Sequence, residues 1–298
     1  MRVVVAGASG LIGTALVNHL NAAGHEVIRL GRDPAARADD TRYWNPATGA
    51  IDDDAFDGVE GVVNLAGAGI ADRRWTKNRR RELRRSRVGA TELLVEAMMA
   101  NPNPPGVLVA GSAVGFYGDR GDEVLDEESG PGTGFLATLV ADWEAAATSA
   151  TAAGIRVALA RTGLVMAENA PFLTRMLPLF KLGLGGPLGR GRQWWPWITL
   201  EDEVRALTHL LESDIAGPVN LCAPNPVTNQ EFTRTLASVL RRPAFLAIPR
   251  FGPQLLLGRE LADELLFSST RAHPTALTTA GFEFHHPDLE ATLRALLQ

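Results

Sequence analysis

The spacing of apolar and polar positions along the chain predicts a layered fold of strands and helices. Short apolar runs, which indicate buried strands, lie near residues 2–6, 26–30, 59–65, 107–111 and 155–160. Segments of helical periodicity lie near 11–23, 76–100, 135–152 and 201–213. Strands that alternate with helices in this way form a parallel sheet covered by helices on both faces. We therefore predict an α/β protein built on a doubly wound parallel sheet.

The pattern changes after about residue 165, where a glycine-rich segment replaces the regular alternation. This segment runs from Gly183 to Gly191 and ends in Trp194-Trp195-Pro196-Trp197, preceded by Gln193. Tryptophans beside glycines can stack on a planar or sugar ring, or they can fill a core beneath a long loop. Later helices are predicted around 253–267 and 288–297. We interpret this part of the chain as a smaller C-terminal substrate lobe.

A glycine turn joins the first predicted strand to the first predicted helix. It reads Gly7-Ala8-Ser9-Gly10-Leu11-Ile12-Gly13. Glycines at this spacing allow a tight turn, close approach of a pyrophosphate, and packing of the helix against the sheet, while N–H groups at the helix start face the anion. The context, a strand followed by this turn and a helix, is the one that a Rossmann-like dinucleotide site requires. The candidate cofactor contacts here are Gly7, Ser9, Gly10, Leu11, Ile12 and Gly13.

The residue after the second strand bears on which dinucleotide binds. Proteins that bind NAD place a carboxylate near the adenosine ribose, whereas this chain has Gly31-Arg32. A guanidinium pairs well with a 2′-phosphate. Arg32 therefore favours NADP over NAD. The alternative is that Arg32 is a solvated loop residue and that Asp33 contacts the ribose.

Composition narrows the possible partners and compartment. The 298 residues are 46% hydrophobic with a formal net charge of −5, which argues against nucleic-acid or anionic-membrane binding as the main activity. The single cysteine is compatible with a reducing compartment, and no apolar window is long enough for a membrane helix. We expect a cytoplasmic protein with a small-molecule substrate and no metal site. The oligomeric state is left open.

One segment runs against the acidic balance of the chain. Residues 73–87 contain nine basic side chains in fifteen positions. Because Trp75 is the only aromatic residue among them, a solvated basic face with one or two cofactor contacts is favoured over RNA binding.

Several stretches resemble the extended short-chain dehydrogenase/reductase superfamily, and more narrowly its sugar-nucleotide-epimerase-like branch. They include Asn64-Leu65-Ala66-Gly67, Asp142-Trp143-Glu144-Ala145-Ala146, Arg161-Thr162-Gly163 and Ala223-Pro224-Asn225-Pro226-Val227-Thr228-Asn229. The last fifty or so residues resemble the small C-terminal domain of unknown function found in that branch. We thus expect a dinucleotide-binding domain over 1–165 with later strands returning from 197–222, substrate-lobe segments over 166–248, and a small domain over 249–298.

The resemblance implies further cofactor contacts. The loop residues Leu65, Ala66 and Gly67 follow the third strand, and Val165 follows the fifth. Arg87 stands where extended members have an asparagine, and as a fixed cation it could reach the cofactor phosphates. Glu82 is expected near the adenine or ribose, although a plain surface glutamate is an open alternative.

The catalytic pair of the superfamily is missing. Active members use a tyrosine acidified by a lysine four residues later, and this chain contains no Tyr-x-x-x-Lys. Phe135 and Leu139 occupy the two positions. Ser112 matches the superfamily serine that bonds a substrate carbonyl or hydroxyl, or it caps the next turn. Tyr117 is the candidate acid, with a pKa expected close to its ordinary value of about 10.

Two main hypotheses follow from this pattern. One is an NADP-dependent oxidoreductase or epimerase acting on a small polar substrate, nucleotide-linked in one version. The other is a protein that binds NADP(H) and reports its presence without turnover. The sequence favours the enzyme slightly, because the substrate lobe is elaborate.

Overall fold

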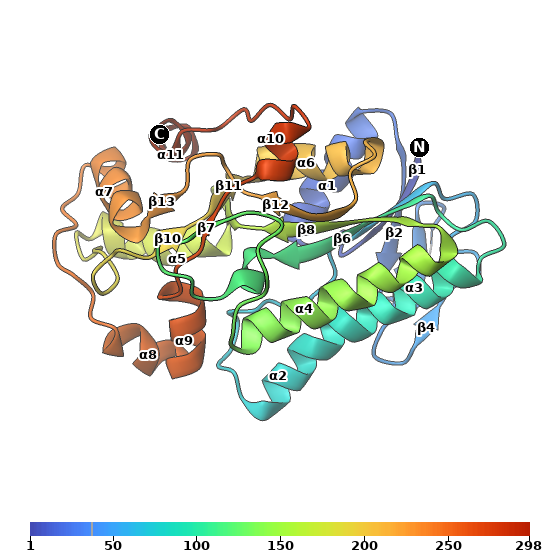
Figure 1. Ribbon diagram of the computed structural model, residues 1–298, viewed down its shortest axis with the longest axis horizontal. Helices are drawn as coiled ribbons and strands as arrows, with labels where there is room; N and C mark the ends of the chain where they lie inside the picture. The colour runs from blue at the N-terminus through green and yellow to red at the C-terminus, as the bar shows by residue number, and fades with distance from the viewer. Residues whose placement is uncertain (37) are drawn as a thin grey trace.

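The computed structural model describes residues 1–36 and 38–298 and confirms the doubly wound α/β fold. Within this part of the chain, eight strands form one sheet in the order β12-β8-β6-β5-β1-β2-β3-β4 (Figure 1). All neighbours are parallel except the pair β3 and β4. The strands are β1 (Arg2–Ala6), β2 (Glu26–Gly31), β3 (Thr41–Asn45), β4 (Ala50–Ile51), β5 (Gly61–Asn64), β6 (Val107–Ala113), β8 (Arg156–Thr162) and β12 (Gly217–Leu221).

Alternate residues of the central strands face two different helical layers. Val3 and Val5 pack with α1 (Leu11–Ala22) and α6 (Leu200–Glu212). Val4 and Ala6 pack with α3 (Ala90–Ala100) and α4 (Phe135–Thr148), which lie side by side across one face in Figure 1. Burial on both faces explains why these strands are continuous apolar runs in the sequence.

The predicted helix over 76–100 is interrupted. It consists of α2 (Lys77–Arg84), a π-helical turn η2 (Arg85–Gly89) and α3, with the Thr76 side chain capping α2 by accepting a hydrogen bond from the Arg79 amide. A π turn contains one residue more than an α turn, and such insertions are frequent at functional sites.

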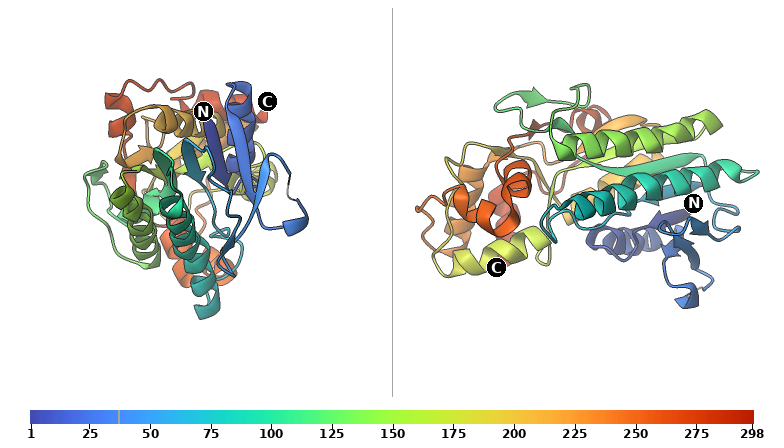
Figure 2. Two further views of the ribbon diagram at one scale, coloured as in Figure 1. Left: turned by 90° about the vertical axis from the view of Figure 1, so that its right-hand side faces the viewer. Right: turned by 90° about the horizontal axis from the view of Figure 1, so that it is seen from below.

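The C-terminal lobe lies beyond the end of the sheet (Figure 2, right). Its core contains Trp195, Trp197 and Phe232, and its main helices are α5 (Pro171–Lys181), α7 (Asn229–Leu240), α8 (Phe251–Leu257), α9 (Arg259–Leu266) and α11 (Leu289–Leu297). The helix predicted over 253–267 is two helices, α8 and α9, separated by Gly258 at φ +90°.

Short elements complete the fold: β7 (Val124–Leu125), β9 (Leu164–Met166), β10 (Trp194–Trp195), β11 (Trp197–Thr199), β13 (Val227–Thr228), β14 (Arg271–Ala272), α10 (Thr275–Thr279), η1 (Pro34–Ala36), η3 (Val114–Tyr117) and η4 (Ser149–Ala153). Of the helices in the described ranges, none has the length and apolar character needed to cross a bilayer.

Candidate functional site

The glycine turn is closed so tightly that only glycine fits at two positions. Gly7 has φ +81°, and a Cβ atom on it would lie 2.7 Å from the Leu65 carbonyl carbon. A Cβ atom on Gly13 would lie 2.1 Å from the Gly7 carbonyl oxygen. The turn therefore presses α1 against β1 and against the loop that follows β5.

The first turn of α1 is free to meet an anion. Gly10 precedes the helix without a side-chain cap, and the first turn carries no acidic residue. The leading N–H groups of a helix lack partners within the helix and sit at the positive end of its dipole. Leu11 and Ile12 are half-buried and Ser9 is exposed. This end of α1 can therefore bind a phosphate group.

The loop after β5 is fixed by the buried side chain of Asn64. Its Nδ2 donates to Thr91 Oγ1 at 2.9 Å, and its Oδ1 accepts from the Ala66 amide at 3.1 Å. Thr91 Oγ1 also accepts from the Trp143 indole at 2.9 Å. These bonds hold Leu65, Ala66 and Gly67 at the carboxyl end of the sheet, beside Gly7.

Arg87 brings a positive charge to this loop. A Cβ atom on Gly67 would lie 3.1 Å from Arg87 Cζ, and Arg87 Nη1 donates to the Ala68 carbonyl at 3.0 Å. Burial, and to a smaller extent the charge of Arg79, lower the pKa of Arg87 to about 10, so it remains cationic at neutral pH. No ion pair to Arg87 occurs among residues 1–36 and 38–298. A partly buried cation without a carboxylate partner suits an external anion.

The other predicted cofactor contacts are placed as follows. Val165 lies in β9 and packs against the same core cluster as Ile12 and Leu65. Arg32 is exposed directly after β2. Asp33 accepts a hydrogen bond from the Ala35 amide at 2.9 Å, which gives that carboxylate a role in the local turn.

Glu82 has a partner within the protein. Arg79 Nη1 lies 2.8 Å from Glu82 Oε1, and this hydrogen bond is the main reason that the pKa of Glu82 is lowered. Other cations of the basic segment are paired as well, Arg80 with Glu260 and Arg84 with Asp142. Much of the predicted basic face is thus compensated.

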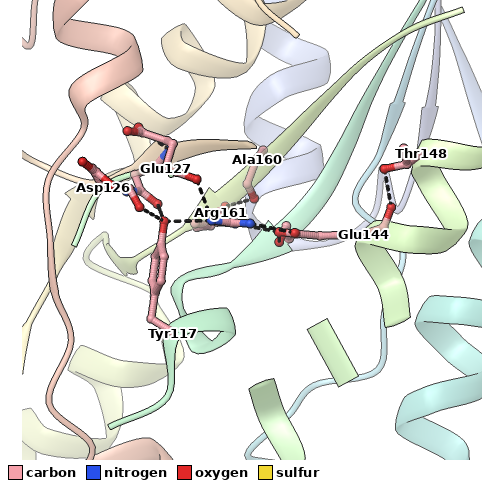
Figure 3. A network of polar contacts seen from close by, with 10 residues as sticks. Tyr117, Asp126, Glu127, Glu144, Thr148, Ala160 and Arg161 are labelled. Atoms are coloured by element: carbon pink, nitrogen blue, oxygen red, sulfur yellow. Dashed lines mark hydrogen bonds and ion pairs between the residues drawn. The ribbon is translucent and has the colours of Figure 1, made fainter. Parts of the chain in front are cut away.

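A buried polar network joins the carboxyl ends of β6, β8 and β12 (Figure 3). Arg161 makes two parallel bonds to Glu144, from Nε to Oε1 at 2.8 Å and from Nη2 to Oε2 at 2.9 Å. Ser112 Oγ lies 2.6 Å from Glu144 Oε1. On its other side, Arg161 Nη1 donates to the Tyr117 hydroxyl at 2.9 Å.

The prediction for Tyr117 is wrong in one respect. Its side chain is fully buried, and its hydroxyl lies 2.7 Å from Asn220 Oδ1 and 2.8 Å from the Asp126 carbonyl. Burial raises the pKa of Tyr117 to about 12, although Arg161 opposes the shift. The pKa of Tyr117 is therefore not close to its ordinary value, contrary to the prediction from the sequence, and its hydroxyl is engaged within the core.

The positions of the missing pair are apolar in space as well. Phe135 packs edge-on against Trp75 with ring centres 5.0 Å apart, and Leu139 is buried in the same cluster. The carboxylate of Glu264, from α9, accepts hydrogen bonds from the amides of Phe135 at 2.9 Å and Leu136 at 2.7 Å. The C-terminal segment thereby caps α4, a contact for which the sequence carries no local signal.

Two of the tryptophans are core residues. Trp195 and Trp197 are 6% and 1% exposed, so the stacking interpretation fails for them. Trp194 is half-buried, with its indole donating to Asp122 at 2.9 Å. A cavity of about 480 Å³ adjoins this region and is lined by Arg190, Arg192, Gln193, Arg250 and Phe267, among others.

The acidic start of α6 contains one carboxyl that the helix dipole does not explain. Glu203 is fully buried, accepts a hydrogen bond from Thr162 Oγ1 at 2.7 Å, and has no partner for Oε2 among the described residues. Burial raises the pKa of Glu203 to about 8.

The chain matches the model of the NAD dependent epimerase/dehydratase family over residues 3–222. It belongs to that family. Residues 248–296 match a domain of unknown function, DUF1731. The family and its C-terminal domain confirm the resemblance drawn from the sequence.

Relatives match this family member over nearly its whole length. The epimerase family protein ML0860 of Mycobacterium leprae is 47% identical over 287 residues, covering 95% of this chain and 92% of that protein. A crystal structure of human SDR39U1 isoform 2 with NADPH has a TM-score of 0.88 and 35% identity, covering 99% of both chains. A nucleoside-diphosphate sugar epimerase from Corynebacterium glutamicum has a TM-score of 0.81 and 34% identity, covering 100% of this chain and 58% of that one.

Proposed function

We propose that this protein binds NADP(H) at the carboxyl end of its sheet and transfers hydride to or from a polar substrate held against the C-terminal lobe. The observation that carries the proposal is the pairing of an uncapped helix start with the uncompensated cation of Arg87 beside the same loop. Both features favour a bound polyphosphate. The human relative solved with NADPH supports the choice of coenzyme.

The residues present fit the coenzyme. Gly7 and Gly13 form a cradle that a Cβ atom would fill, and the amides at the start of α1, which has no side-chain cap, would hold the pyrophosphate. Arg87 would contribute charge from the β5 side. Arg32, exposed beyond β2, would hold the 2′-phosphate that distinguishes NADP from NAD. When bound, the coenzyme supplies or accepts the hydride.

The substrate is proposed to be anionic and nucleotide-linked. The cavity of about 480 Å³ presents Arg190 and Arg192, which form no ion pair within the described ranges, and the aromatic wall of Phe267. Arginines bind phosphates, and an aromatic face packs against a ring. The name of the Corynebacterium glutamicum relative, a nucleoside-diphosphate sugar epimerase, agrees with this substrate class.

Within this proposal, Ser112 contacts the substrate and Tyr117 does not. Ser112 lies at the carboxyl end of β6, the edge where parallel sheets bind ligands. Tyr117 instead supports Arg161 from within the core. The proton that accompanies hydride transfer would then be exchanged with solvent, taken up when hydride is added to the substrate and released when hydride is removed.

A non-catalytic NADP(H) sensor is the second candidate. It is favoured by the apolar pair Phe135 and Leu139 and by the burial of Tyr117. The two candidates differ in one measurable step. The protein is incubated with NADPH deuterated at C4 and a pool of small metabolites and nucleotide sugars, and products are examined by mass spectrometry. Deuterium in a metabolite supports the enzyme, whereas NADPH binding without transfer from either C4 face supports the sensor.

A further inference from the structure

The hydroxyl proton of Ser112 is committed to Glu144. Both carboxylate oxygens of Glu144 accept hydrogen bonds from Arg161, at 2.8 and 2.9 Å. A carboxylate held along both edges by a guanidinium is ionised and can only accept. The proton in the 2.6 Å contact between Ser112 Oγ and Glu144 Oε1 therefore belongs to Ser112.

The residues around Glu144 keep the Ser112 proton in its hydrogen bond to this carboxylate. Arg161 is 3% exposed, its Cζ atom lies 3.6 Å from the centre of the Phe116 ring, and its third nitrogen donates to Tyr117. The Tyr117 hydroxyl accepts from Arg161 and directs its own proton toward Asn220 or the Asp126 carbonyl. Within residues 1–36 and 38–298, the side chains that donate to the Glu144 carboxylate are Ser112 and Arg161, and the remaining nitrogen of Arg161 is engaged with Tyr117.

We infer that Ser112 acts toward the substrate only as a hydrogen-bond acceptor, so that it selects a hydroxyl or amino group and discriminates against a carbonyl. With its proton engaged, Oγ offers lone pairs alone to a ligand at this edge of the sheet. A carbonyl oxygen placed there would meet another acceptor, and the bond would be lost. The inference rests on the proposed function, because it concerns the substrate group bound at that site.

This assignment makes Glu144 and Arg161 positioning residues. Glu144 turns the Ser112 hydroxyl, and Arg161 keeps Glu144 ionised and immobile. The sequence alone allowed Ser112 to bond either a carbonyl or a hydroxyl of the substrate, and the inference leaves the hydroxyl.

Matched probes test the inference. Cyclohexanol and cyclohexanone differ only in the group concerned, and their dissociation constants are measured by ligand-observed NMR on the full chain with and without NADPH. We expect cyclohexanol to bind about tenfold more tightly. In Ser112→Ala the ratio should fall to about one, while Ser149→Ala, an exposed serine on η4, should leave it unchanged.

Glu144→Ala provides a sharper test. Alanine removes the oxygen that accepts from Ser112 Oγ and so frees the Ser112 proton, and the preference should shift toward cyclohexanone. If this variant fails to fold because Arg161 is left unpaired, Ser112→Ala still decides. Equal affinities in the wild type, a preference for cyclohexanone, or binding that does not depend on Ser112 overturns the inference. NADPH binding is measured in the same samples by calorimetry, so its loss would count against the proposed function and not against the role of Ser112.

Discussion

Replacing Glu203 by glutamine should remove a pH dependence of stability that the fold builds in. The carboxyl has a pKa near 8 in the folded chain because it is buried with one hydrogen bond, from Thr162, against an ordinary value of 4.5. Between these two values the folded protein binds a proton that the unfolded chain has released. Stability therefore falls as pH rises through this window.

The size of the effect follows from the shift. A difference of 3.5 pKa units between 4.5 and about 8 corresponds to about 5 kcal/mol, reached above pH 8, as an order-of-magnitude value at 1.36 kcal/mol per unit. Glutamine keeps the acceptor for Thr162 and does not ionise. The free-energy difference between Glu203→Gln and wild type should therefore grow by several kcal/mol, in favour of the variant, from pH 5 to pH 9.

The assay is equilibrium urea unfolding followed by circular dichroism at five pH values. The difference in free energy of unfolding between the two proteins at each pH removes the contributions of the other titrating groups, which the two proteins share. Glu96→Gln on α3, an exposed glutamate, serves as the control and should run parallel to wild type. If the curves for Glu203→Gln and wild type also run parallel from pH 5 to pH 9, the burial argument for Glu203 is refuted.

Four further predictions concern the candidate site. Gly13→Ala places a methyl group 2.1 Å from the Gly7 carbonyl oxygen. Calorimetry should therefore show at least tenfold weaker NADPH binding, and denaturation should show a free energy of unfolding lower by about 1–3 kcal/mol. Unchanged NADPH binding would show that the turn can open to accept the methyl group. Arg32→Ala should weaken NADPH about tenfold and leave NADH unchanged, and an unaltered preference would remove Arg32 from the 2′-phosphate site. Arg87→Met should weaken the binding of both NADPH and NADH by a similar factor of about ten. Arg81, whose guanidinium bonds Asn78, provides the control, and Arg81→Met should leave both affinities unchanged. Loss of NADPH affinity alone in Arg87→Met would contradict a pyrophosphate contact. Glu264→Ala should lower the free energy of unfolding by about 1 kcal/mol through loss of the α4 cap, and an unchanged value would mean that water replaces the carboxylate.

The sequence predicted the parts of the fold that depend on local pattern. The glycine turn was recognised because the residues that it requires are close together in the sequence. In the structure, Gly7 and Gly13 lie so close to neighbouring backbone atoms that a Cβ atom would not fit. The central strands were recognised because burial on both faces makes them uniformly apolar. By contrast, β3, with the polar sequence Thr-Arg-Tyr-Trp-Asn over 41–45, gave no apolar run, and β12 was expected only in general terms, among the strands returning from 197–222.

The candidate site was only partly predictable, because its remaining contacts join distant parts of the chain. Glu264 meets Phe135 across 129 positions, and Asn220 meets Tyr117 across 103. The pKa of Tyr117 was misjudged for this reason, since the burial that raises it depends on partners from separate strands. Glu144 and Arg161 did lie within stretches that resemble the family, which is the one signal that could have drawn attention to them.

The π turn before α3 has a consequence for how this chain can vary. Successive residues of an α-helix are rotated by about 100° around its axis, so one extra residue in a turn re-aims everything on its amino-terminal side. Removing Val88 or Gly89 would leave a continuous helix in which the same arginines face new directions. The direction of the Arg87 guanidinium, which meets the loop after β5, thus depends on the number of residues in this turn. Deletion of one codon would turn the guanidinium away from the loop without any amino-acid substitution.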